Sequence, residues 1–280
     1  MLEQWKRRLP RAGSGTLRNI IVRFAVGMVA CGLALSPLGS FAGSPARQAL
    51  WLTVQACVAD YKLTGAPFPC LSVDLAGGED RGYVVLRDPL GPPDTILTPT
   101  RRVSGIEDPW LRSPAAPNYF DAAWRARTLL EGPDGRPPAP DEFALAVNSA
   151  LTRSQDQFHI HLGCLAPAVK RWLPGLASKL PVGAWTRAGV PLAGAPFWAL
   201  RTGRTDLENL EPLRLAAEAP GGGRNLARMT LVVAETRIAD SEESVLLASY
   251  AGESGSRGHA SAESLLDLAC SGASRTFGAN

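Results

Sequence analysis

Some common functional signatures are absent from this 280-residue sequence, and each absence argues against one class of protein or site. No two of its five cysteines have Cys-x-x-Cys spacing, which argues against a zinc site. No Gly-Lys-Ser/Thr follows the glycines at 221–223, as a P-loop requires. Glycine and proline show no three-residue period, which excludes collagen. Hydrophobic residues make up 45% and charged residues 20% of the chain, so we expect a folded globular protein.

Basic charge is concentrated at the N-terminus. Residues 1–42 hold six of the 29 Lys and Arg residues but one of the 26 Asp and Glu residues, so the rest of the chain carries 23 bases against 25 acids. Nucleic-acid binding needs clustered positive charge on the folded domain. We therefore expect no nucleic-acid partner.

The same segment has the pattern of an export signal. A basic stretch precedes the apolar run Phe24–Leu35, and Ser40-Phe41-Ala42 has the small-x-small form of a signal-peptidase site. We predict that residues 1–42 are a signal peptide or, if uncleaved, an N-terminal membrane anchor. Residues 43–280 are then a single domain, either periplasmic or anchored to the inner membrane and facing the periplasm.

The cysteines agree with an oxidising compartment. Cys31 lies in the predicted signal, and the other four form an even set that indicates two disulfides. Three pairings are possible. We favour Cys57–Cys70, which closes a short loop, together with Cys164–Cys270.

Strands that come in hairpins, with helices between them, predict an α+β fold with an antiparallel sheet and flanking helices. The expected helices span 46–62, 118–131, 167–180 and 261–268. The expected strands span 83–86, 95–98, 143–147, 157–162, 229–234 and 245–250.

Two of the three histidines lie in the predicted strand 157–162. Alternation places Phe158, Ile160 and Leu162 toward a core, and it places Gln157, His159 and His161 on the opposite face. The loop before the strand supplies amide, hydroxyl and guanidinium donors that suit phosphate oxygens; these are Asn148, Ser149, Arg153, Ser154 and Gln155. Two alternatives are ordinary surface histidines and a His-x-His metal site.

The histidine row resembles the signature of the histidine-triad superfamily, with Gln157 in place of the first histidine. More closely, the chain resembles the bacterial CDP-diacylglycerol pyrophosphatase family over residues 50–270. The segments that carry this resemblance are Gly82–Asp88, Gly91-Pro92, Pro99–Arg102, Asn118–Phe120, Ala123–Arg127, Asn148–Cys164, Ala260–Glu263 and Cys270.

The resemblance implies a histidine-triad-like core and hydrolysis of CDP-diacylglycerol to CMP and phosphatidate through a cytidylyl-histidine intermediate. His159 corresponds to the nucleophile, and His161, Gln157 and Ser154 would hold the phosphate oxygens. The predicted substrate-binding residues are Asn148, Arg153, Ser154, Gln155 and Arg102. No cofactor or metal is expected. Gln157 cannot titrate as a histidine would.

The expected partners are the CDP-diacylglycerol lipid and a membrane surface, and the oligomeric state stays open. We predict an apolar membrane rim over 181–200 with Trp185, Leu192, Phe197 and Trp198. The competing functions are an exported metal-binding protein that uses His159 and His161, and a non-catalytic nucleotide- or lipid-binding module.

Overall fold

A computed structural model describes residues 45–87, 94–188, 195–251 and 261–272. The predicted signal or anchor at 1–42 and Leu192 lie outside these residues, and the prediction of one domain over 43–280 stays a prediction. None of the described helices is long and apolar enough to cross a membrane.

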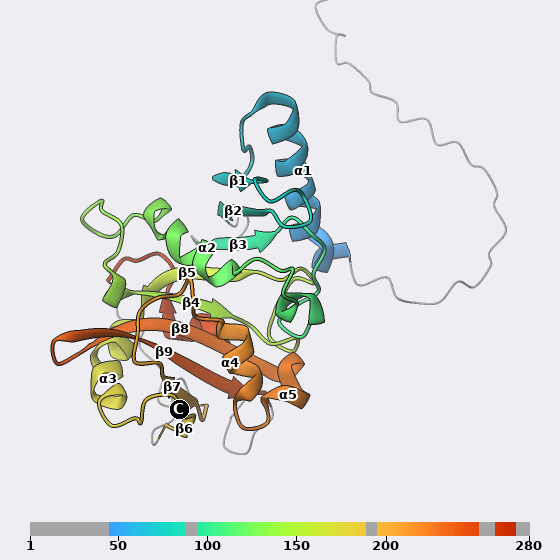
Figure 1. The fold of residues 1–280 in the computed structure, drawn as a ribbon. Helices are drawn as coiled ribbons and strands as arrows, with labels where there is room; N and C mark the ends of the chain where they lie inside the picture. The colour runs from blue at the N-terminus through green and yellow to red at the C-terminus, as the bar shows by residue number, and fades with distance from the viewer. Residues whose placement is uncertain (1–44, 88–93, 189–194, 252–260, 273–280) are drawn as a thin grey trace, which may run out of the picture. The chain divides into compact units, whose positions relative to one another are not determined.

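The elements form an α+β fold around one antiparallel sheet, as predicted (Figure 1). The helices are α1 (Ala49–Thr64), α2 (Tyr119–Arg125), α3 (Pro167–Ala177), α4 (Pro212–Glu218) and α5 (Gly222–Asn225). The strands are β1 (Ser72–Asp74), β2 (Tyr83–Arg87), β3 (Thr95–Pro99), β4 (Phe143–Val147), β5 (Ile160–Leu165), β6 (Thr186–Arg187), β7 (Trp198–Arg201), β8 (Met229–Ile238), β9 (Ser241–Tyr250) and β10 (Leu266–Asp267). The short 3-10 helices are Pro45–Gln48, Pro109–Arg112, Ala126–Leu129, Pro140–Glu142, Leu226–Arg228 and Ala262–Leu265.

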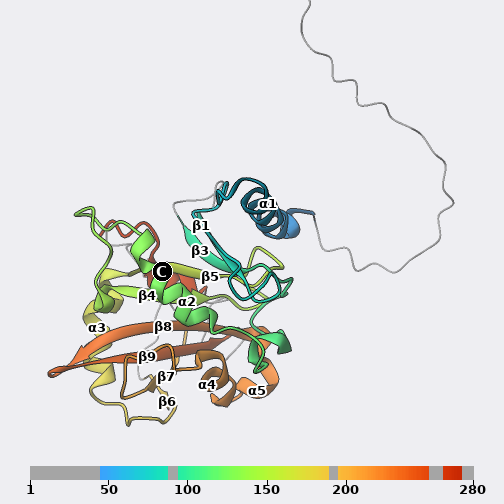
Figure 2. The same cartoon turned by 45° about the horizontal axis from the view of Figure 1, so that its top comes forward.

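The strand order β1-β2-β3-β5-β4-β8-β9-β7-β6 puts β5 in the interior of the sheet, between β3 and β4, and β10 also pairs with β5. Figures 1 and 2 show α1 beside β1 at one end of the sheet and α3 beside β8 and β9. A side chain on β5 is therefore flanked by strands on both sides, which fixes its position.

The two faces of the sheet differ in how they are covered. One face carries a continuous hydrophobic cluster that includes Phe158, Ile160 and Leu162, as the predicted alternation requires. The other face carries two separate clusters. One lies under α3 and the 3-10 helix Ala262–Leu265, and the other lies under α1. Cross-strand pairing places His161 beside Ile96 of the α1 cluster and Ala146 of the α3 cluster, so the histidines lie at the junction of the two.

Both predicted disulfides are confirmed, Cys57–Cys70 and Cys164–Cys270. The first fixes the C-terminal half of α1 to the loop before β1. The second joins β5 to the segment after β10. Export of the protein to an oxidising compartment stays a prediction.

Three local predictions are wrong. The predicted strand over 157–162 begins only at Ile160, and the predicted helix over 261–268 is instead a 3-10 turn followed by β10. In the predicted membrane rim, Phe197 is fully buried in the α3 cluster, and Trp185 donates its indole N–H to the carbonyl of Leu215. Phe197 therefore contributes to the core and offers no apolar surface to a membrane.

Candidate active site

His159 lies directly before β5 and His161 is the second residue of that strand, so the two rings are neighbours. Both side chains are buried, with 7% and 5% of each residue exposed, and their ring centroids are 4.8 Å apart in an edge-to-face arrangement. The alternative that they are ordinary surface histidines is therefore wrong. They project from the sheet face where the two hydrophobic clusters meet.

The hydrogen bond of His159 determines which of its ring nitrogens carries the proton. Nδ1 lies 2.7 Å from the backbone oxygen of Gln157, and a carbonyl only accepts, so Nδ1 carries the proton. Nε2 then holds the free lone pair, and no described residue hydrogen-bonds to it. Burial, together with the positive charge of His161, lowers the pKa of His159 to about 4. His159 is thus a neutral imidazole at neutral pH.

His161 is held as a cation by two carboxylates. Its Nδ1 donates to Asp94 Oδ2 at 2.8 Å, and its Nε2 lies 3.1 Å from Glu263 Oε1. Burial by itself would lower the pKa of His161, but the hydrogen bonds and charges of Asp94 and Glu263 outweigh it and raise this pKa to about 9. Two rings in contact therefore have opposite protonation states at neutral pH.

Asn148 orients Glu263 toward His161. The Asn148 side-chain amide donates to Glu263 Oε1, and its oxygen accepts from the backbone N–H of Ala262 at 2.8 Å and from the Ser261 hydroxyl at 3.2 Å. Burial tends to raise the pKa of Glu263, but the hydrogen bond and charge of His161 outweigh this effect and lower it to about 2. Glu263 is therefore ionised next to the histidine cation.

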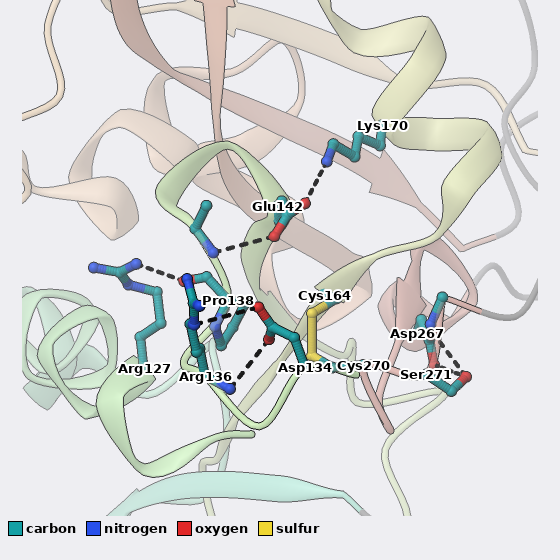
Figure 3. The surroundings of a disulfide bond; sticks show 12 residues. Arg127, Asp134, Arg136, Pro138, Glu142, Cys164, Lys170, Asp267, Cys270 and Ser271 are labelled. Atoms are coloured by element: carbon teal, nitrogen blue, oxygen red, sulfur yellow. Dashed lines mark hydrogen bonds and ion pairs between the residues drawn. A yellow bond between two sulfur atoms is a disulfide. The ribbon is translucent and has the colours of Figure 1, made fainter. Parts of the chain in front are cut away.

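The segment that carries Glu263 is fixed to β5 in three ways. β10 pairs with the end of β5, where Leu266 lies opposite Leu165. The Cys164–Cys270 disulfide, shown in Figure 3 beside the Glu142–Lys170 ion pair, closes the same region covalently. At Gly163 an added Cβ would lie 3.3 Å from the Cα of Leu268, so the absence of a side chain permits this close approach.

Two comparisons with known proteins cover this whole region. The family model for CDP-diacylglycerol pyrophosphatase matches residues 45–274. A Yersinia pestis protein named CDP-diacylglycerol pyrophosphatase is 35% identical over 224 residues, which are 79% of this chain and 83% of that protein. The chain belongs to the CDP-diacylglycerol pyrophosphatase family.

Gln157 stands where the histidine-triad pattern has its first histidine. Its side-chain amide is hydrogen-bonded to backbone groups of the segment 99–103. Its Nε2 donates to the carbonyls of Pro99 and Arg101 at 3.0 and 2.9 Å, and its Oε1 accepts from the N–H of Val103. These bonds hold the residue so that its own carbonyl faces His159. In this pyrophosphatase-family chain Gln157 thus positions the nucleophile candidate through its backbone, and direct contact of its amide with phosphate stays a prediction.

The loop between β4 and β5 carries four of the predicted substrate-binding residues, and the structure separates them. Only Asn148 contacts the histidine pair. Arg153 is largely buried, where its guanidinium binds Glu107 at 2.7 Å and lies 3.4 Å from Asp156. Ser154 is exposed.

Gln155 and Arg102 both lie against the start of α1. The amide of Gln155 accepts from the backbone N–H of Leu50 and donates to the carbonyl of Ala46. Arg102 donates to Gln48 and lies over the Trp51 ring at 5.5 Å. Their roles in substrate binding stay predictions.

Two carboxylates set the charge of His161, and neither was among the predicted site residues. Asp94 comes directly before the predicted strand 95–98, and only the β3–β5 register, with Ile96 opposite His161, brings it to the same face. Glu263 falls in a segment that was predicted to be helical, although the family resemblance includes it. No group of three or more His, Cys, Asp or Glu side chains among the described residues is arranged to hold a metal ion.

Proposed function

We propose that the protein hydrolyses CDP-diacylglycerol to CMP and phosphatidate through a cytidylyl group carried on Nε2 of His159. The observation that supports this route is the buried neutral His159, with Nδ1 bonded to a carbonyl and Nε2 free, in contact with the cationic His161. Membership of the pyrophosphatase family supports the substrate and the overall reaction.

In the first step, the lone pair of Nε2 attacks the phosphorus that bears cytidine. A P–N bond forms, the P–O bond to the bridging oxygen breaks, and phosphatidate leaves with that electron pair. The ring keeps its Nδ1 proton on the Gln157 carbonyl, so the cytidylyl-imidazole is cationic and remains a good leaving group. Covalent catalysis of this kind replaces one difficult displacement by two easier ones.

In the second step, water attacks the same phosphorus. The P–N bond breaks, its electron pair returns to Nε2, and the proton lost by water passes to solvent. CMP leaves and His159 regains its neutral form. Because its pKa of about 4 lies well below neutral pH, the ring is ready for another cycle without waiting to lose a proton.

His161 supplies the positive charge. Its Nδ1 bond to Asp94 fixes the ring, and the N–H on Nε2 can point to a phosphate oxygen on which charge changes in the transition state. Glu263 occupies that N–H in the free enzyme. We therefore propose that a substrate phosphate exchanges with Glu263 when it binds, so that one anion replaces another.

Stereochemistry at phosphorus tests the covalent route. CDP-diacylglycerol made chiral at the cytidylyl phosphorus with sulfur and ¹⁸O would be hydrolysed by the wild-type chain, and the configuration of the CMP analogue would be determined. Two in-line displacements give net retention. Inversion would mean direct attack by water and would contradict the histidine intermediate.

A trapping experiment locates the intermediate. After an alkaline quench, which preserves a phosphoramidate, peptide mass spectrometry should find the cytidylyl adduct on the peptide that contains His159. His159→Gln should abolish this adduct. The adduct is not expected on His161, and its appearance there would reverse the assignment.

We also propose that the protein acts outside the cytoplasm at a membrane surface. The predicted signal or anchor at 1–42, the two disulfides and the lipid nature of the substrate support this location. Protease added to intact and to permeabilised cells tests it. A protein on the periplasmic side is degraded once the outer membrane is opened, whereas a cytoplasmic protein survives until the inner membrane is lysed.

A further inference from the structure

Helix α1 is apolar on two opposite sides. Its inner side packs on the sheet through buried side chains, which are Leu50, Val54, Cys57 and Val58. Its outer side carries a second apolar row at spacings of four, three and four residues, which places the row along one side of a helix. That row consists of Leu52, Ala56, Ala59 and Leu63, all of them exposed.

The two leucines of this row are among the most exposed large apolar side chains of the described residues. Leu52 is 65% exposed and Leu63 is 85% exposed, and the loop that follows adds Phe68 at 74% and Leu71 at 39%. Five of the eight exposed large hydrophobic residues found in the described ranges fall between 52 and 71. Concentrated exposed apolar surface of this kind marks a contact surface.

This outer surface lies next to the candidate active site. The inner side of α1 packs with Ile96, which pairs across the sheet with His161 on the same face. Gln155, from the loop that leads to His159, accepts from the backbone N–H of Leu50. Because an α-helix with its side chains is about 10 Å across, the outer row of α1 lies about one helix diameter from the sheet face that bears the histidines.

The chemistry of the substrate and the course of the chain indicate what covers this surface. The acyl chains of CDP-diacylglycerol stay in a bilayer while its diphosphate lies at the bilayer surface. In the sequence, residues 1–44 come just before the short 3-10 helix Pro45–Gln48 that leads into α1, and they include the apolar run Phe24–Leu35. Two cationic side chains lie here, Lys62 in the last turn of α1 and Arg102 beside its start, as suits a surface of lipid phosphates.

We propose that the outer row of α1, together with Phe68 and Leu71, rests on the lipid bilayer that contains the substrate. This inference rests on the proposed function and replaces the predicted rim at 181–200, where Phe197 is buried. With α1 against the lipid, the diphosphate head group would lie near the start of α1, which Gln155 joins to the loop that precedes His159. Docking is mainly apolar, because Lys62 is already paired with Glu79.

The test compares one catalytic site on two forms of the substrate. The full chain is assayed on CDP-dioleoylglycerol in phosphatidylcholine vesicles and on a short-chain CDP-diacylglycerol below its micelle concentration. The variant is Leu52→Gln/Leu63→Gln. The matched control is Leu129→Gln/Val182→Gln, which replaces exposed apolar residues elsewhere, 38% and 57% exposed.

We expect the α1 variant to lose at least about tenfold in kcat/KM on vesicles, since it removes two leucines from the bilayer contact. Its kcat/KM on the short-chain substrate should change by less than about twofold, and the control variant should match wild type on both. Sedimentation with vesicles should fall in parallel.

Three outcomes would overturn the inference or its basis. Equal vesicle activity of the α1 variant and wild type would remove the docking surface while leaving the proposed function intact. A wild-type dimer that becomes monomeric in the α1 variant, with vesicle activity unchanged, would assign the surface to a second copy of the chain. Wild-type protein that cleaves neither substrate would instead refute the proposed function.

Discussion

His159 and His161 project from the same sheet face two residues apart, with ring centroids 4.8 Å apart, yet their surroundings differ in charge. His159 has a neutral carbonyl on Nδ1 and the positive charge of His161 beside it. His161 has a carboxylate on each side. The same imidazole is therefore neutral in one position and cationic two residues later, which supports the proposed division into a nucleophile, His159, and a charged donor, His161.

This contrast predicts a pH window for the reaction. Protonation of His159 removes the nucleophile as the pH falls through about 4, and deprotonation of His161 removes the cation as the pH rises through about 9. Between these limits kcat/KM on a soluble substrate should be nearly constant.

The largest effect is expected when the cation is removed. His161→Gln should lower kcat/KM by about 10³-fold, because the positive donor to the phosphate is lost. It should also move the acid limb of the pH profile to higher pH, since the charge of His161 helps to hold the pKa of His159 down. The profile from pH 3 to 8 measures both effects. If His161→Gln lowers kcat/KM but leaves the acid limb of the pH profile in place, the charge of His161 does not affect the pKa of His159.

The next largest effect is expected at Asp94. Asp94→Asn keeps the shape of the side chain but removes the charge that helps to raise the pKa of His161. We expect a loss of about 10 to 100-fold at pH 8 and a smaller loss at pH 5.5, because His161 is still protonated at the lower pH. The alkaline limb should move from about 9 toward neutrality.

The control for Asp94 is Asp80→Asn, whose side chain is 82% exposed and pairs with Arg101. Its pH profile should match wild type. An equal loss for Asp94→Asn at pH 5.5 and pH 8 would indicate that Asp94 acts by shape alone.

The third prediction compares the two disulfides. Cys164→Ser/Cys270→Ser opens a link across 106 residues and should cost about 3 to 5 kcal/mol of unfolding free energy, whereas Cys57→Ser/Cys70→Ser opens a link across 13 residues and should cost about 1 to 2 kcal/mol less. Urea denaturation measures this difference. Only Cys164→Ser/Cys270→Ser should move the alkaline limb of the pH profile to lower pH, because the Cys164–Cys270 disulfide holds the segment that bears Glu263.

Short-range signals in the sequence were sufficient for much of the fold. The β4 bounds, the β8–β9 hairpin and a helix that begins at Asn118, which is the N-cap of α2, follow from patterns within a few residues. Both disulfide pairs were also predicted. The strands and the helix depend on local alternation and on capping chemistry, whereas the even cysteine count indicates two disulfides and leaves three pairings, of which the favoured one is present.

The features that were predicted wrongly or not at all depend on contacts between residues that are distant in sequence. Gln157 and Phe158 continue the predicted alternation, but Gln157 bonds to the loop after β3 instead of a strand ladder, so β5 starts later. Asp94 and Glu263 reach His161 only through the β3–β5 register and the β10–β5 pairing. A single sequence does not contain that register, so it could identify the histidines but not the groups that make them differ.

The smallest effect is expected at Glu263, and it separates the two carboxylates of His161. Glu263→Gln removes an anion from the N–H that the substrate phosphate is proposed to take, so KM on the short-chain substrate should fall while kcat changes by no more than about threefold. The alkaline limb should still move down, because the charge of Glu263 also helps to raise the pKa of His161. Steady-state kinetics at pH 7 and pH 9 measure both. A large loss of kcat with KM unchanged would show that Glu263 is needed in the transition state and does not exchange with substrate.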